Sequence, residues 1–93
     1  MKLEIISPEA TLYLGEATSV ALPGVGGSFQ LLENHAPIVS ILSEGSVRLK
    51  GFDIAKVPTS FAHLFSKEGS DTVLAIKSGT VEMKKNQLVL LVD

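Results

Sequence analysis

Residues 22–37 read LPGVGGSFQLLENHAP, and this stretch is the most informative part of the sequence. A strand-like run ends at its start, three glycines follow within residues 24–27, an apolar run covers residues 29–32, and a polar corner closed by proline covers residues 34–37. Glycine adopts positive φ at little steric cost, whereas proline fixes its own φ. The stretch therefore predicts two shaped, exposed loops at one end of a β-structure, where docking residues are commonly carried.

Short alternating runs separated by turn residues continue on both sides of this stretch, which is the pattern of a β-sandwich or barrel. We expect strands over residues 2–5, 11–14, 16–22, 38–42, 46–50, 72–76, 80–84 and 87–92. The last run is apolar on both faces and predicts a central strand. Lys85 and Asn86 before it predict a two-residue hairpin turn, since asparagine tolerates the left-handed conformation.

Residues 51–70 allow more than one structure. Residues 52–57 are strand-like and end at Pro58. Residues 58–69 alternate as a strand would, yet they also fit a capped helix with an apolar stripe that ends at Gly69. We favour a strand because the neighbouring segments are strands, and a helix remains the alternative.

The run 16–22 carries small side chains on one of its faces. Ala17, Ser19 and Ala21 alternate with Thr18 and larger apolar residues. A face of small residues predicts either close approach of a second layer or a shallow exposed surface.

Composition limits the possible functions. Hydrophobic residues make up 45% and charged residues 19% of the 93 residues, which is typical of a packed globular protein and sufficient for one domain over residues 1–93. There is no cysteine, and the formal net charge is -2 without a concentrated basic face. These features argue against a disulfide framework, a thiolate metal site and nucleic-acid binding.

Catalytic and ligand-binding motifs are missing from the sequence. The glycines at 24–27 lack the GK[ST] ending of a phosphate loop and precede a strand-like run, so we do not expect nucleotide binding there. His35 either bonds a nearby backbone carbonyl or contacts a partner, while His63 is expected to have no special role. Glu33 is expected to be a solvated loop charge, and Lys84 with Lys85 a solvated hairpin tip.

Six motifs in order resemble the epsilon subunit of F-type ATP synthases, which is called delta in mitochondria. The matching segments are the opening strand and turn at 1–9, LGE at 14–16, LPG at 22–24 followed by NHAP at 34–37, GSVRL at 45–49, SGTVEM at 78–83, and LVLLVD at 88–93. Ser28 departs from the family pattern, where an acidic residue is common. Gln30 and Thr80 stand where glycines are common, and residues 51–70 are longer than the usual connection.

The resemblance implies an all-β fold, a flattened antiparallel β-sandwich of a single domain. It also implies a non-catalytic rotor subunit that couples the membrane ring to the gamma shaft, at the cytoplasmic face of the bacterial inner membrane. The implied partners are the gamma subunit and the c-type ring subunits, and we expect no catalytic residue, cofactor or metal. The expected partner-binding residues, all expected at one end and against the ring, are Gly24, Val25, Gly26, Gly27, Ser28, Asn34, His35 and Ala36.

Longer members of the family carry a two-helix hairpin after the strand that corresponds to residues 87–92. That hairpin is associated with inhibition of ATP hydrolysis, so we expect no such inhibition from these 93 residues. An alternative from another class is a small β-sandwich module that binds a ligand such as a carbohydrate. The absence of tryptophan and the single tyrosine, Tyr13, argue against it.

Overall fold

The computed structural model describes residues 1–93 and contains ten strands and two short 3-10 helices. The strands are β1 (Lys2–Ile6), β2 (Thr11–Glu16), β3 (Ser19–Gly24), β4 (Gly27–Leu32), β5 (Ile38–Leu42), β6 (Gly45–Lys50), β7 (Phe65–Glu68), β8 (Asp71–Ile76), β9 (Gly79–Lys84) and β10 (Gln87–Val92). The 3-10 helices are η1 (Ile54–Lys56) and η2 (Thr59–Leu64). No helix is long and apolar enough to cross a membrane.

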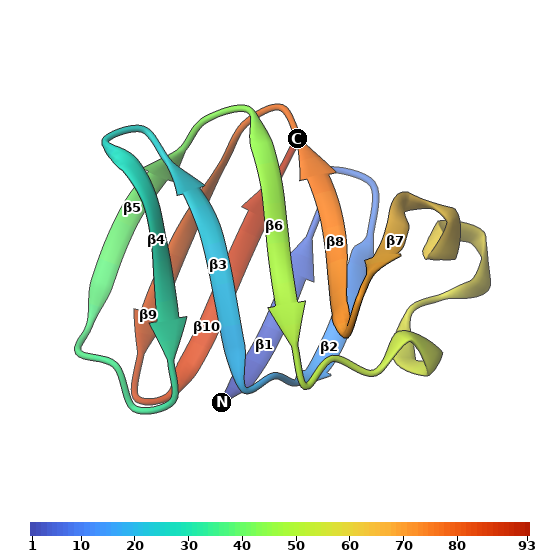
Figure 1. The fold of residues 1–93 in the computed structure, drawn as a ribbon, viewed down its shortest axis with the longest axis horizontal. Coiled ribbons are helices and arrows are strands. Elements are labelled where there is room, and N and C mark those ends of the chain that lie inside the picture. Colours follow the sequence, from blue (N-terminus) through green and yellow to red (C-terminus); the bar gives the residue numbers. More distant parts are fainter.

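The strands form two facing layers, which confirms the predicted sandwich (Figure 1). One layer has the order β2-β1-β10-β9-β5, and the other has the order β4-β3-β6-β8-β7. A single bridge between Gly24 of β3 and Leu42 of β5 joins them. Every strand pair is antiparallel except β1 with β10, which is parallel.

Alternate residues of the strands fill the space between the layers, as the period of two requires. Val20 and Leu22 of β3 and Leu88 and Leu90 of β10 belong to one cluster of 21 buried residues. The predicted central strand is confirmed, because β10 pairs with β1 on one side and β9 on the other. The predicted hairpin turn is also confirmed, with Lys85 at φ 52° and Asn86 at φ 59°.

The prediction of strands over residues 52–57 and 58–69 is wrong for most of this region. Residues 54–56 form η1, which begins where the Asp53 carboxylate accepts a hydrogen bond from the Ala55 amide at 3.1 Å. Residues 59–64 form η2 rather than a capped α-helix, and only Phe65–Glu68 is a strand. Aromatic packing overrides the local alternation here, because the Phe52 ring stacks between Tyr13 and Phe65 with centroid distances of 4.1 and 5.3 Å.

Candidate docking surfaces

The residues 24–28 form the turn between β3 and β4, at the upper end of the sandwich in Figure 1. Of the three glycines only Gly27 has positive φ, at +127°, so the glycine argument applies to one position and not to Gly24 or Gly26. The Val25 amide donates to the Ile41 carbonyl at 3.1 Å, which fastens the turn to β5. The Val25 side chain is nevertheless 67% exposed, so the turn presents an apolar tip.

The prediction that residues 24–28 and 34–36 lie at one end is wrong. The two loops flank β4, whose register runs from Gly24 opposite Gly27 to Ser19 opposite Leu32. A six-residue strand separates its ends by about 17 Å. The corner at 34–36 therefore lies at the opposite end of the sandwich, beside the β9–β10 hairpin (Figure 1).

Local hydrogen bonds fix the corner. The Asn34 amide, at φ 62°, donates to Asn86 Oδ1 at 2.7 Å, which ties the corner to the hairpin. Nδ1 of His35 lies 2.7 Å from the Ala36 carbonyl oxygen, so the backbone-bonded alternative for His35 is present in the structure. Its ring remains exposed, and contact with a partner stays a prediction.

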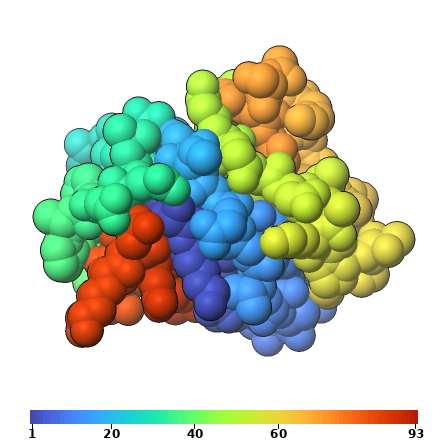
Figure 2. All heavy atoms as spheres, turned by 90° about the horizontal axis from the view of Figure 1, so that it is seen from below, coloured from blue at the N-terminus to red at the C-terminus, as the bar shows by residue number.

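The start of the chain lies at this same end, as Figure 2 shows in dark blue. The Met1 ammonium donates to Oε1 of Glu33 at 2.6 Å and to the Ala17 carbonyl at 2.9 Å, and the Met1 side chain is buried. Glu33 is an exposed loop charge, as expected, but it is paired with the ammonium rather than free. The folded chain brings it to the ammonium across 32 residues, which no local sequence pattern could indicate.

The outward face of the layer β2-β1-β10-β9-β5 carries exposed apolar side chains among polar ones. Val39 and Ile41 of β5 are 72% and 66% exposed. The register sets them beside Glu82 and Thr80 of β9, with the exposed Leu91 of β10 next in line. We call Val39, Ile41 and Leu91 the apolar face. No prediction from the sequence covered this face, although the mostly apolar run IVSIL at Ile38–Leu42 was an available signal.

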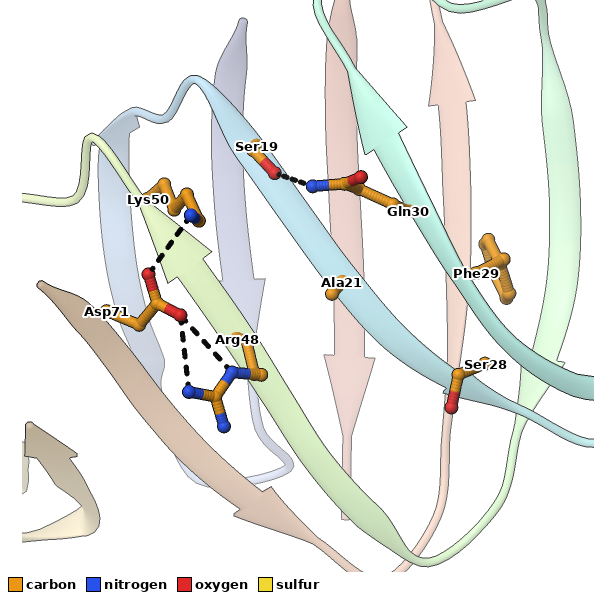
Figure 3. Close-up of a pocket in the computed structure, with 8 residues that line it drawn as sticks. All are labelled: Ser19, Ala21, Ser28, Phe29, Gln30, Arg48, Lys50 and Asp71. Carbon is orange, nitrogen blue, oxygen red and sulfur yellow. Dashed lines mark hydrogen bonds and ion pairs between the residues drawn. The ribbon is translucent and has the colours of Figure 1, made fainter. Parts of the chain in front are cut away.

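The outward face of the other layer is polar and hollowed. A groove of about 450 Å³ runs over β3, where the small side chains of Ser19 and Ala21 leave space (Figure 3). The predicted shallow exposed surface is confirmed only at Ala21, which is partly exposed, whereas Ser19 and Ala17 are buried. On the β4 side of the groove, Gln30 Nε2 donates to Ser19 Oγ at 2.6 Å.

An ion-pair cluster lines the other side of the groove. Arg48 of β6 contacts Glu68 Oε1 at 3.1 Å and Asp71 Oδ2 at 3.2 Å, and the Lys50 ammonium lies 3.6 Å from Asp71 Oδ1. The hydrogen bonds to Glu68 and Asp71 raise the pKa of Arg48. These charges compensate one another, and no group of three or more potential metal ligands exists in the molecule. The geometry provides surfaces for docking, without a nucleophile or an acid–base pair.

Comparison with known proteins shows which family this chain belongs to. Residues 1–93 match the family model described as ATP synthase, Delta/Epsilon chain, beta-sandwich domain. An ATP synthase epsilon chain of Leptospira interrogans is 34% identical over 93 residues, which is all of this chain and 61% of the relative. An ATP synthase epsilon chain of Chlorobium limicola is 33% identical over 92 residues, covering 99% of this chain and 88% of the relative.

A solved structure also shares the fold. A chain in the cryo-EM structure of the central stalk and c-ring of the Tetrahymena thermophila mitochondrial ATP synthase superposes with a TM-score of 0.71 over 99% of this chain and 62% of that chain. The sequences are 13% identical, so this likeness concerns the fold alone. The chain spans about three fifths of the Leptospira relative and nearly nine tenths of the Chlorobium relative.

Proposed function

The chain belongs to the delta/epsilon chain family of ATP synthase subunits, as its β-sandwich domain, and from this premise we propose that it acts as a non-catalytic rotor subunit. It would connect the shaft, a gamma-type subunit, to the ring of c-type membrane subunits, at the cytoplasmic face of the bacterial inner membrane. Such a part must transmit torque without deforming. Two hydrogen-bonded layers around a continuous core meet that requirement. The family assignment removes the support for the carbohydrate-module alternative.

The observation that carries this proposal is the apolar face. Val39 and Ile41 of β5 and Leu91 of β10 lie on the two strands that flank β9, and each keeps about half or more of its surface exposed. Clustered exposed apolar side chains on a small protein are typical of a protein interface. We assign this face to the shaft subunit.

The ends of the sandwich would contact different partners. We propose that the turn at 24–28, with its exposed Val25 tip, rests on the membrane ring. The corner at 34–36 lies at the far end and would contact the shaft subunit together with the apolar face. This keeps the predicted residues as partner-binding residues while dropping their shared location.

Co-purification with the gamma-type subunit tests the proposal. Ile41→Glu places a charge at the centre of the apolar face and should lower the recovered partner at least about tenfold, since a charge buried at an interface is costly. Ala75→Glu is the control, because Ala75 is also exposed but lies on β8 of the polar layer. Stoichiometric recovery of gamma with both variants would refute the assignment of the face. Failure of the unaltered chain to retain any gamma-type subunit would refute the rotor function itself.

A further inference from the structure

The edge strands on the two lateral sides of the sandwich differ in length, charge and regularity of pairing. On one side, β7 has only four residues and includes Lys67 and Glu68, and β2 ends in Glu16 and pairs with β1 through a register shift. Charges, short length and irregular pairing are the usual means of preventing an edge from accepting another strand. On the other side, neither β4 (GSFQLL) nor β5 (IVSIL) contains a charged residue or a proline.

The backbone of β4 has unpaired groups along its outer edge. β4 pairs only with β3, and its register is regular over all six residues. Gly24 and Gly27 close the turn, so their backbone groups face one another. By the alternation of an antiparallel ladder, Phe29 and Leu31 also direct their amides and carbonyls towards β3. Ser28, Gln30 and Leu32 therefore direct theirs outwards, and only the Leu32 carbonyl is occupied, by the His35 amide at 3.2 Å.

We propose that in the free subunit this edge pairs with β4 of a second copy of the chain, in a two-fold symmetric antiparallel arrangement centred on Gln30. Such a dimer would continue the sheet β4-β3-β6-β8-β7 across the axis. The inference is independent of the rotor assignment.

The sequence of β4 suits self-pairing because a two-fold interface must be complementary to itself. With Gln30 on the axis, its side-chain amide would leave Ser19 Oγ and meet the Gln30 amide of the second copy, and each amide offers both a donor and an acceptor. Ser28 then faces Leu32 of the second copy, and Phe29 faces Leu31 of the second copy. A charged residue anywhere on this strand would face uncharged or like-charged neighbours, and β4 carries none. The edge of β5 behind it is equally uncharged, so both layers can approach without burying a charge.

Sedimentation equilibrium of the purified chain tests the proposal, with a pair of variants at one position. Gln30→Pro removes the outward amide but none of the β3–β4 ladder bonds, since an edge strand tolerates proline where its N–H faces solvent. Gln30→Ala is the matched control, because it also loses the Ser19 bond but keeps the amide. The dissociation constant should rise at least about tenfold for Gln30→Pro relative to Gln30→Ala, which corresponds to about 1.4 kcal/mol.

Amide hydrogen exchange supplies a readout that does not depend on Gln30→Pro folding. As the concentration of the unaltered chain rises, the amides of Ser28, Gln30 and Leu32 should slow, while those of Phe29 and Leu31 should be slow throughout. Gln30→Lys, which sets two ammonium groups on the axis, should abolish the concentration dependence. A chain that is monomeric to millimolar concentration, or exchange at Ser28 and Gln30 that never changes, would overturn the proposal. A monomer whose Ser28 and Gln30 amides slow only with the gamma-type subunit would assign the edge to that partner instead.

Discussion

The side of the sandwich at η1, η2 and β7 is closed, whereas the side at β4 and β5 is open, and the two sides use aromatic and apolar residues in opposite ways. On the closed side, the Phe52 ring stacks between Tyr13 and Phe65. On the open side, Leu32, Val39 and Ile41 remain largely exposed.

This difference separates residues that hold the fold from residues that await a partner. The long segment between β6 and β8, which we call the insertion, packs on its own sandwich through Phe65, which is 9% exposed. Phe61 is half-buried against the core, and Leu64 remains 42% exposed. The insertion is thus mainly an extension of the core, so the partner surface has to be sought elsewhere. Substitutions on the two sides should therefore separate stability from association.

The largest loss of stability is expected for Phe65→Ala on the closed side. Removing a buried phenylalanine costs about 3–5 kcal/mol, because both burial and packing are lost. Here the Phe52 ring would also lose one of its stacking partners. Urea unfolding should show this loss, whereas Ser66→Ala, the exposed neighbour on the same strand, should stay within about 0.5 kcal/mol. Equal midpoints for the two variants would mean that the closed side does not belong to the core.

The next effect tests the backbone of the open side. Gly27 has φ +127° and Gly26 does not have positive φ, yet a Cβ at either position would meet no atom within 4 Å. The two positions therefore have the same room for a side chain, and they differ only in backbone strain. Gly27→Ala should cost about 1–3 kcal/mol, whereas Gly26→Ala should be neutral or slightly stabilising because it restricts the unfolded chain. Thermal unfolding of both variants measures the difference, and a destabilised Gly26→Ala with a normal Gly27→Ala would contradict the turn geometry.

A smaller effect with a distinct pH dependence is expected for Tyr13 on the closed side. Its hydroxyl donates to the Glu16 carbonyl at 2.7 Å, and Tyr13→Phe should cost about 1 kcal/mol. Burial raises the pKa of Tyr13, and the Asp53 and Glu16 carboxylates add to the effect. The folded state therefore favours the protonated phenol. Its contribution is fully present below the unfolded pKa of about 10 and is lost as pH rises through the folded pKa.

Denaturant unfolding across alkaline pH checks this sign. The difference in stability between the unaltered chain and Tyr13→Phe should be constant at neutral pH and should shrink above about pH 10. A difference that grows with pH would mean that the phenolate is stabilised in the fold.

The open and closed sides also differ in how far the sequence predicts them. Strand alternation predicted β6 and β9 closely, because each buries one face and the period of two is then visible in the residues, whereas apolar runs predicted β5, β8 and β10. Residues 52–64 could not be predicted, since stacking with Tyr13, about 40 residues earlier, determines their conformation. The two loops were placed at one end because both are glycine- or proline-shaped. Because one strand, β4, connects the two loops, they had to lie at opposite ends of the sandwich. Predicting the apolar face would have required the order of the strands in the sheet, which no local sequence pattern specifies.

The smallest change in stability is expected for Val39→Thr on the open side, and it gives the sharpest contrast with a buried position. Val39 is 72% exposed, so replacing a methyl group with a hydroxyl should change the free energy of unfolding by less than about 0.5 kcal/mol. The same substitution at Val47, which is fully buried on β6, leaves a hydroxyl without water and should cost about 1–3 kcal/mol. Chemical denaturation of both variants compares identical chemistry in two environments. If Val39→Thr proved as costly as Val47→Thr, the apolar face would already be covered within the subunit, and its assignment to the shaft subunit would fail.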